Sequence, residues 1–482
     1  MSKKKNTEGL TVKKSENFSE WYQQLILKSG LADYSSVSGC IIFRPLSYLI
    51  WEKIKNLCDE EFKKVGIKNC YFPLFIPEKA FEKEQEHVKG FTPEVAWVTQ
   101  AGKTKLNEKL AVRPTSEAIM YESYAKWIRS YRDLPLQLNQ WNNVVRWEFN
   151  NPVPFFRTRE FLWNEGHSAF ATEKQALEES KKIKEIYETV VGEYMALPGI
   201  YGRKTQKEKF AGAVFSEKIH YMLPNGRVIE GPCFHHDGQN FSKAYDIKFL
   251  DKNGKEDFVW QNTYAISTRM LGTMFAIHSD DKGLILPPKI AENKAVIIPI
   301  LFDKTKNQIL KQAEKIAKQF SDLGVILDSR EEVSPGWKYN EWELKGIPLR
   351  IELGPKDLEK NSVVVVKRTD SKKQIIKIKD LKKRLPILLE EIQIDLFNKA
   401  KKLLDSNQKK TENKKELIKF IKDKKMVLVP LCEGSKCEET LKSDTGGAKT
   451  LFVDPENTSV KSKKCIICNK SAQYWAYVGK TY

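Results

Sequence analysis

Arginine and histidine are scarce in this sequence, although the chain is strongly basic. Only 14 of its 82 basic residues are arginine, 68 are lysine, and six residues are histidine. With 63 acidic residues, the formal net charge is +19. This charge favours a polyanionic partner, with nucleic acid as the first choice, but a lysine-rich solvated surface would explain the composition equally well.

Long hydrophobic runs are also missing. The longest, such as AVIIPILF from Ala295, are far shorter than the ~20 residues that a membrane helix needs. The amino-terminal MSKKKNTEGLTVKK has no apolar segment behind it, so we expect neither a secretory signal nor a membrane anchor. With 482 residues, 41% of them hydrophobic, the sequence predicts a cytoplasmic protein of two to four domains.

Four of the eight cysteines lie close together near the end of the chain. Cys432 and Cys437 are separated by four residues, and Cys465 and Cys468 by two. Paired thiolates at these spacings are typical of a closed tetrahedral zinc site. In a chain without an export signal, metal binding is favoured over a disulfide framework. The alternative is four reduced surface thiols.

Hydrophobic periodicity predicts mixed elements in the first 290 residues. Apolar residues recur at helical spacing from Leu46 to Val65, which predicts a helix. The other elements expected here are a strand over 70–77, a helix over 117–129, a strand over 136–149, a loop over 150–159, a strand over 161–170, and helices over 174–195 and 268–280.

The pattern changes after Pro287 and Pro288, and we place a domain boundary near Ala291. Strand-like and helical segments then alternate, which indicates an α/β domain. A lysine-rich stretch over 379–425 is expected to be helical and to lead into the cysteine-bearing tail. No internal repeat or long flexible linker is evident.

Three of the scarce arginines stand together on a predicted strand–loop–strand. They are Arg146, Arg157 and Arg159. Because a strand alternates its faces, Arg146 and Glu148 on the strand expected over 136–149 project to the same side. The arginine fork suits phosphate, and the sequence has no GxxxxGK[ST] phosphate loop. The cluster indicates either a nucleotide site or a surface ladder of ion pairs.

Several segments resemble the class II aminoacyl-tRNA synthetases, in the form found in prolyl-tRNA synthetases of the archaeal and eukaryotic type. VVRWEFNNPVPFFRTREFLWNEGHSAFAT resembles motif 2, and VRPTSE resembles the amino-acid-binding motif. GCIIFRPLSYLIWEKI with YFPLFIP resembles motif 1, and STRMLGTMFAIHSDDKGLILPP resembles motif 3. WELKGIPLRIELGP resembles the anticodon-binding domain, and the cysteine tail resembles the zinc domain. The resemblance covers Phe18 to Tyr482.

The resemblance implies an α+β catalytic domain, an antiparallel sheet flanked by helices, followed by two α/β domains. The implied divisions are an N-terminal basic extension (1–17), the catalytic domain (18–291), the anticodon-binding domain (292–395) and the zinc-binding domain (396–482). It also implies a homodimer that attaches L-proline to tRNA(Pro), using ATP and Mg²⁺.

The resemblance also assigns roles to individual residues. The residues implied for ATP are Arg146, Glu148, Arg157, Thr158, Glu230, Ser267 and Arg269, with Arg146 and Arg269 catalytic. Those implied for proline are Thr115, Glu117, Arg146, Trp163, Glu165, His167 and His235. Glu352 and Lys367 are implied to read the anticodon, although folding roles are equally compatible with them. The zinc would have a structural role, and relatives direct the terminal tyrosine, here Tyr482, toward the catalytic domain.

One segment departs from the family pattern. Family members commonly have a run like QGGTSHH, whereas this chain has EGPCFHH from Glu230 to His236. A carboxylate therefore replaces a carboxamide at residue 230, and Cys233 replaces a hydroxyl residue. We keep Glu230 as a contact to nucleotide or metal and make no prediction for Cys233.

The spacing between motifs argues against an editing insertion. Residues 167 and 267 are 100 positions apart, too few for the editing domain of bacterial-type relatives. We therefore expect some activation of alanine or cysteine without hydrolytic correction on this chain. A serine or threonine enzyme is disfavoured by VRPTSE followed by WNEGH, and a noncatalytic RNA-binding relative by the presence of Arg146 and Arg269.

Overall fold

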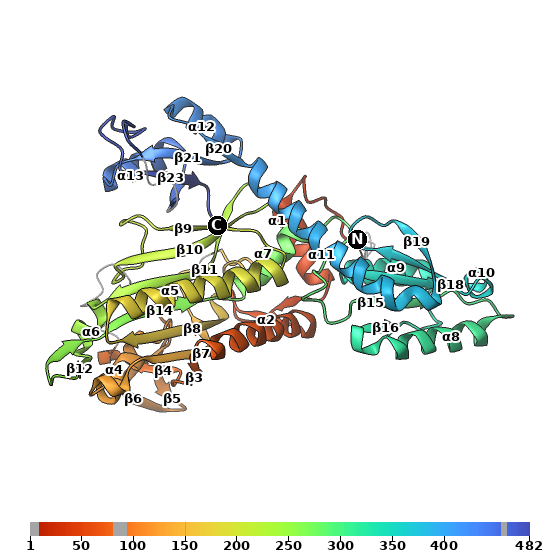
Figure 1. Cartoon of the computed structure of the whole chain (residues 1–482), viewed down its shortest axis with the longest axis horizontal. Helices are drawn as coiled ribbons and strands as arrows, with labels where there is room; N and C mark the ends of the chain where they lie inside the picture. Colours follow the sequence, from red (N-terminus) through yellow and green to blue (C-terminus); the bar gives the residue numbers. More distant parts are fainter. Residues whose placement is uncertain (1–8, 81–93, 150, 455–459) are drawn as a thin grey trace.

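A computed structural model describes residues 9–80, 94–149, 151–454 and 460–482 (Figure 1). Part of the predicted N-terminal extension, residues 1–8, lies outside this description. Its remainder packs on the first domain, because Leu10 and Val12 contact the main hydrophobic core. Lys14 Nζ also donates to the carbonyl of Ser279 over 2.8 Å.

An antiparallel sheet forms the centre of the first domain. From one side to the other its order is β9-β10-β11-β14-β8-β7, with β3 added in parallel. Its strands are β3 (Lys68–Asn69), β7 (Leu136–Val145), β8 (Glu160–Phe170), β9 (Ile200–Arg203), β10 (Phe215–Met222), β11 (Val228–Gly238) and β14 (Trp260–Ala265).

One face of this sheet is covered by helix α5, which lies across β8, β11 and β14 (Figure 1). The buried Glu179 of α5 accepts hydrogen bonds from Ser168 of β8 and Asn262 of β14. The helices of this domain are α1 (Phe18–Lys28), α2 (Pro45–Lys64), α4 (Glu117–Trp127), α5 (Glu173–Glu188), α6 (Asn240–Tyr245) and α7 (Arg269–His278), with the 3₁₀ turn η1 (Tyr131–Asp133) and the π-helix η2 (Thr189–Tyr194). Helix α5 does not cover the opposite face of the sheet, which carries the cavity described below.

The predicted helices of the first domain are confirmed with small shifts at their ends. Helix α2 buries Ile50, Ile54 and Phe62, the stripe expected from the sequence, and starts at Pro45, where a missing N–H costs nothing. The helix expected over 174–195 is α5 followed by η2. Smaller sheets complete the domain: β1 (Ala32–Tyr34) with β2 (Ile41–Phe43), β12 (Lys248–Leu250) with β13 (Glu256–Phe258), and β4 (Phe75–Pro77), β6 (Thr104–Val112) and β5 (Trp97–Ala101).

The second domain is built on a five-stranded mixed sheet of order β16-β15-β17-β18-β19. Strands β16, β15 and β17 are parallel to one another, whereas β18 pairs antiparallel with both β17 and β19. The alternation of strand-like and helical segments in the sequence predicts the parallel part. Its elements are β15 (Ala295–Pro299), α8 (Lys306–Gln319), η3 (Ser321–Leu323), β16 (Val325–Leu327), α9 (Pro335–Leu344), β17 (Leu349–Leu353), α10 (Pro355–Glu359), β18 (Ser362–Lys367), β19 (Lys373–Lys377), η4 (Ile378–Asp380) and α11 (Leu381–Ser406).

The carboxy-terminal region extends the central sheet. A single bridge between Val453 and Arg203 joins β22 to β9, so the four strands of this region continue the sheet in the order β20-β21-β23-β22. Its elements are β20 (Gln408–Lys410), α12 (Lys414–Lys422), β21 (Met426–Leu431), α13 (Ser435–Asp444), β22 (Lys449–Val453) and β23 (Tyr474–Gly479). Packing of the tail against the first domain brings the chain end near the cavity described below.

The prediction of one helical stretch over 379–425 is wrong in its second part. Helix α11 ends at Ser406, and Gln408 pairs in parallel with Met426 to start β20. The chain becomes helical again only in α12. Lysine-rich composition does not distinguish an exposed edge strand from a helix, since lysine is common on both.

No helix among the described residues combines the length and the apolar character that a membrane crossing requires.

Candidate active site and cysteine cluster

A cavity of about 250 Å³ lies on the face of the central sheet opposite α5. Side chains alternate along a strand, so Trp163, Glu165 and His167 of β8 all face it. Nine residues predicted from the sequence line this cavity: Thr115, Glu117, Arg146, Trp163, Glu165, His167, His235, Ser267 and Arg269.

A second cavity of about 290 Å³ adjoins the first. Arg269 lines both cavities, as do Lys218 and Glu208. Arg157 and Glu230, both predicted for the nucleotide, line the second one. The structure therefore divides most of the predicted residues between two cavities that share part of their lining.

Two predicted nucleotide residues line neither of these cavities. Thr158 is buried beside them and lines a small space of about 20 Å³ with Ser267 and Arg269. Glu148 is exposed and lies in a turn. The prediction that it shares one strand face with Arg146 is wrong, because β7 ends at Val145.

The end of β7 has a clear cause. Its partner strand β8 begins at Glu160, so pairing stops at the Val145–Glu160 pair and the chain leaves the sheet. The backbone N–H of Arg146 still donates to the carbonyl of Arg159 over 2.7 Å. Arg159 itself turns away from both cavities and donates to the carbonyl of Ser38 over 2.9 Å.

Arg146 is held in the cavity wall by a carbonyl and by aromatic rings. Its Nε donates to the carbonyl of Pro114 over 3.1 Å, and its guanidinium lies 5.3 Å from the Trp163 ring centroid. Burial lowers the pKa of Arg146, although an arginine stays charged under all ordinary conditions. This arrangement points a fixed positive charge into the space.

Arg269 is fixed at the first residue of α7. Its Nε donates to the carbonyl of Phe156 over 3.2 Å, and Nη1 lies 3.4 Å from the carbonyl oxygen of Glu230. Burial likewise lowers the pKa of Arg269, with Glu230 opposing this effect. With Arg146, it gives the wall of the first cavity two fixed positive charges, and Arg269 also borders the second cavity.

Glu165 accepts hydrogen bonds from several neighbours in the wall. Ser116 Oγ donates to it over 2.5 Å, Asn142 Nδ2 over 2.6 Å and Gln140 Nε2 over 3.2 Å. Burial alone raises the pKa of Glu165, but hydrogen bonds from His167, Ser116 and Asn142 lower it to about 2. The carboxylate is therefore charged and holds the floor of the cavity in one arrangement.

Thr115 and Glu117 approach the cavity from the start of α4. The Thr115 hydroxyl donates to the Glu117 carboxylate, which lies in the first turn of that helix. A carboxylate there is favoured by the helix dipole. It offers an acceptor for an ammonium or imino group inside the cavity.

His235 completes the wall on β11. Its Nδ1 lies 2.7 Å from Ser216 Oγ, and burial lowers the pKa of His235 to about 3. The ring is therefore neutral near pH 7 and serves as a hydrogen-bonding group rather than a fixed charge.

Two lysines of this site were missed by sequence reasoning. Lys204 and Lys218 both bond to the Glu230 carboxylate, over 2.5 and 2.6 Å. Nothing in the sequence singles them out among 68 lysines. The only sequence signal for them was the carboxylate at residue 230, where the family pattern commonly has a carboxamide.

The predicted anticodon residues lie on neighbouring strands of the second domain. Glu352 of β17 is buried and accepts from Arg350 and from Lys373, each over 3.1 Å. Lys367 of β18 donates to Glu391 over 3.3 Å. Each is thus held by an ion pair within the domain.

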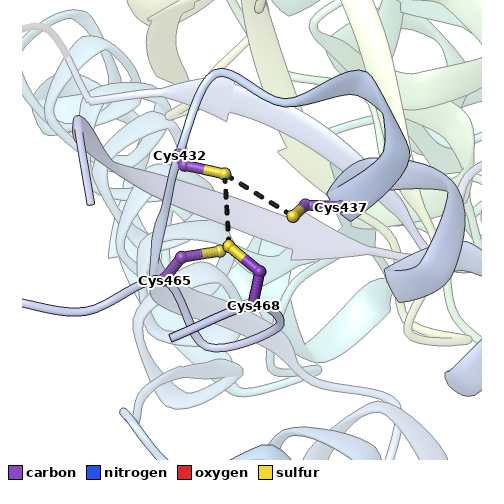
Figure 2. A group of neighbouring side chains, drawn as sticks. All are labelled: Cys432, Cys437, Cys465 and Cys468. Carbon is purple, nitrogen blue, oxygen red and sulfur yellow. Dashed lines mark hydrogen bonds between the residues drawn. The ribbon is translucent and has the colours of Figure 1, made fainter. Parts of the chain in front are cut away.

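The four tail cysteines converge, as their spacing predicts (Figure 2). All four sulfur atoms lie within 4.8 Å of one another. Cys432 Sγ lies 3.5 Å from Cys437 Sγ and 3.8 Å from Cys468 Sγ. Four thiolates bound to one zinc at about 2.3 Å would stand about 3.8 Å apart, so the cluster fits a tetrahedral ion.

Local structure favours the thiolate form of one cysteine, while burial raises the pKa of Cys432 and Cys437. The backbone N–H of Lys470 lowers the pKa of Cys468 to about 7. Cys432 directly follows β21, Cys437 lies in the first turn of α13, and Cys465 and Cys468 lie between β22 and β23.

Three family models match the chain. The tRNA synthetase class II core domain (G, H, P, S and T) matches residues 97–278, and the anticodon binding domain matches residues 294–386. The carboxy-terminal domain of prolyl-tRNA synthetases matches residues 414–482.

Full-length relatives agree with these matches. The cytoplasmic proline–tRNA ligase of Arabidopsis thaliana is 44% identical, with 100% of this chain and 92% of the relative aligned. The proline–tRNA ligase of Natranaerobius thermophilus is 44% identical over 94% of each chain. The chain belongs to the prolyl-tRNA synthetase family.

A solved structure supports the same membership. The prolyl-tRNA synthetase of Cryptosporidium parvum, crystallised with halofuginone and AMPPNP, superposes with a TM-score of 0.94. It is 42% identical and aligns with 98% of this chain and 100% of its own. The predicted fold, a class II core followed by an anticodon-binding domain, is confirmed. Like other class II synthetases, this family member uses ATP as a substrate.

Proposed function

We infer that this chain attaches L-proline to tRNA(Pro) in two ATP-dependent steps, through prolyl-adenylate and with release of pyrophosphate. One observation supports this most directly. The residues expected to hold proline and those expected to hold the reacting phosphate line one cavity, although they come from distant segments of the chain. Binding both substrates in one space makes their reaction effectively unimolecular.

The first step places the developing negative charge beside two arginines. A carboxylate oxygen of proline attacks the α-phosphorus of ATP, a P–O bond to the leaving pyrophosphate breaks, and no protein nucleophile takes part. Arg146 is proposed to contact both the α-phosphate and the prolyl carboxylate, and Arg269 the γ-phosphate. Fixed cations in a cavity shielded from water stabilise such charge more strongly than water does.

The proline subsite is proposed for the part of the cavity near α4. Thr115 and Glu117 would accept hydrogen bonds from the imino group of proline. Trp163 and His167 would form the walls around the proline ring. Glu165 would keep these groups in place, since its own carboxylate is already hydrogen-bonded by Ser116 and Asn142.

The nucleotide subsite is proposed for the second cavity and its border with the first. Arg157, Thr158 and Ser267 would contact the nucleotide, and Glu148 the adenine amino group. Glu148 is exposed in this structure, so its contact would require the turn after β7 to move over the nucleotide. Mg²⁺ would neutralise part of the charge on the triphosphate.

The tail cysteines are proposed to hold one structural Zn²⁺. Four thiolates occupy all positions of a tetrahedral ion and leave none for water. The carboxy-terminal region would then act as a rigid support beside the nucleotide cavity, which is lined in part by Leu451 and Tyr482.

A homodimer is proposed through the segment that resembles motif 1. Large apolar side chains are exposed on β1, β2, the loop between them and the first turns of α2. A second copy of the chain that covered this patch would remove apolar surface from water. They are Tyr34, Val37, Ile42, Tyr48 and Leu49.

We propose that residues 292–395 bind the anticodon of tRNA(Pro), with Glu352 and Lys367 reading guanine edges. The boundaries 18–291 and 396–482 are proposed for the catalytic and zinc-binding domains. A cytoplasmic location is proposed from the likeness to the Arabidopsis thaliana relative that is named cytoplasmic.

Amino-acid-dependent exchange of pyrophosphate into ATP tests the proposed reaction. Proline is expected to support exchange, with alanine and cysteine far slower. Exchange with serine or threonine but not proline would indicate a sister enzyme. An absence of exchange with every amino acid, in a folded protein, would indicate an RNA-binding relative without catalysis.

A further inference from the structure

The site contains an ion cluster at the point where the sequence departs from its family. Glu230 begins the EGPCFHH segment on β11, and its two carboxylate oxygens bond separately to Lys204 and Lys218. The three residues come from neighbouring strands of the sheet, since Lys204 follows β9 and Lys218 lies on β10. A carboxamide at residue 230 would carry no charge to hold two ammonium groups.

The two lysines differ in what they face. The Lys204 side chain is 3% exposed, and its Nζ also donates to the carbonyl of Leu451 in β22 over 2.7 Å. The Lys218 side chain is 23% exposed and lines both cavities. Lys204 thus ties the cluster to the carboxy-terminal region, while Lys218 faces the space for substrates.

Lys218 keeps charge and donors available for a ligand. Two ammonium groups and one carboxylate leave the cluster with one net positive charge. Burial alone lowers the pKa of Lys218, but the Glu230 carboxylate raises it, so the group is charged at neutral pH. Its Nζ has three N–H donors, and one of them is directed at Glu230.

The backbone also directs Lys218 toward the reacting groups. The pairing of β10 with β11 shifts at a bulge between Lys218 and His220, a feature that re-aims side chains near active sites. Lys218 stands opposite Cys233, which lines the first cavity. Arg269, on the same border, reaches the backbone carbonyl of Glu230. The ammonium therefore shares the border of the cavities with the arginine proposed for the γ-phosphate.

We propose that Lys218 contacts the phosphates of ATP at the border of the two cavities, and that Glu230 acts as its positioning residue. This inference rests on the proposed function. The carboxylate at residue 230 holds this cation at the border of the two cavities. Lys204 gives the cluster its net positive charge and fixes it to β22.

Kinetics of proline-dependent pyrophosphate exchange test this role in the full chain. Lys218→Met is expected to lower kcat/KM for ATP by about tenfold to a hundredfold, the usual effect of losing a charge-assisted hydrogen bond. The KM for proline should change less than twofold. Lys218→Arg should recover most of the loss, because it restores the charge. Glu230→Gln should raise the KM for ATP while leaving the KM for proline unchanged.

Lys207→Met is the matched control, since Lys207 pairs with Glu439 on the surface. If the wild-type chain exchanges pyrophosphate and Lys218→Met matches Lys207→Met, the role of Lys218 is refuted while the proposed function stands. If the wild-type chain shows no exchange, the proposed function itself fails. Should Lys218→Met unfold, Lys218→Gln and Lys218→Arg decide: equal kcat/KM for ATP in these two variants would overturn the proposal.

Discussion

The catalytic cavity and the cysteine cluster are organised by different forces. In the cavity, Glu165 is fixed by donors from Ser116, Gln140 and Asn142, all from the protein itself. In the tail, four thiols face one another, with Cys432 Sγ only 3.5 Å from Cys437 Sγ. Thiols are weak hydrogen-bond donors. The first site is therefore expected to keep its shape without a ligand, whereas the second depends on a metal.

Metal removal should give the largest effect on amide exchange, concentrated in the tail. The binding free energy of structural zinc, about 10–16 kcal/mol in small domains, is largely folding free energy. Chelation or Cys465→Ser is expected to raise amide hydrogen exchange in β21 and β23 by about a hundredfold or more. Backbone amides of β7 and β8 should exchange as before.

Cys40→Ser removes a thiol outside the cluster and should change neither zinc content nor exchange. Less than half an equivalent of zinc in protein purified without chelator would contradict the dependence of the tail on metal.

Changing Arg146 should affect the catalytic cavity alone. Arg146→Lys keeps the charge but loses the planar fork, and removal of one such fixed donor costs about 10²–10³ in rate. We expect kcat/KM for proline-dependent exchange to fall by this factor, with zinc content and thermal stability unchanged. Arg159→Lys, which alters a neighbouring arginine that lines neither cavity, should stay within a few-fold of the wild type.

Loss of the Glu165 carboxylate should destabilise the first domain in a pH-dependent way. The pKa of Glu165 is about 2 in the folded chain, below its ordinary 4.5. Its stabilisation is therefore fully present above pH 5 and is lost as the pH falls toward 2, with a full size of about 3 kcal/mol. Denaturant unfolding of Glu165→Gln against the wild type should show this difference near pH 7 and little of it near pH 2.5.

Glu178→Gln, on the exposed side of α5, controls for the removal of any carboxylate. A stability difference for Glu165→Gln that does not change with pH would show that the hydrogen bonds, not the charge, matter at this position.

The smallest effect is expected where the two regions meet. The Tyr482 ring lies 5.0 Å from the Phe156 ring, and its hydroxyl accepts from Asn225 Nδ2 over 3.0 Å. Deleting Tyr482 should lower kcat/KM for ATP by about twofold to tenfold, the range for loss of one aromatic contact. Tyr482→Phe keeps the ring and should retain most of the activity; an unchanged rate on deletion would show that the tail end does not order the nucleotide cavity.

Local patterns were sufficient to predict much of the fold. The apolar stripe of α2 and the β-rich segments of β7 and β8 appear where the sequence places them. Strand β20 was not predictable, because its identity depends on pairing with Met426 and its neighbours, which lie beyond a helix. Edge strands formed by long-range pairing carry little local signal.

Part of the site could be predicted because arginine is rare in this chain, so that clustered arginines are conspicuous. Arg146 stood out as one of three clustered arginines, whereas Arg269 was implied only by the resemblance to motif 3, and both line the first cavity. Lys218 did not stand out, since its role follows from a contact between strands β10 and β11. Glu148 was misplaced because the end of β7 is set by the first residue of β8 rather than by its own sequence.

Charging of tRNA(Pro) with labelled proline tests the central claim most directly. The account predicts that the purified chain, with ATP and Mg²⁺, forms Pro-tRNA(Pro), and that Arg146→Lys slows this reaction at the activation step while zinc stays bound. Folded, zinc-loaded protein that forms no Pro-tRNA(Pro), or that charges a serine or threonine tRNA instead, would contradict it.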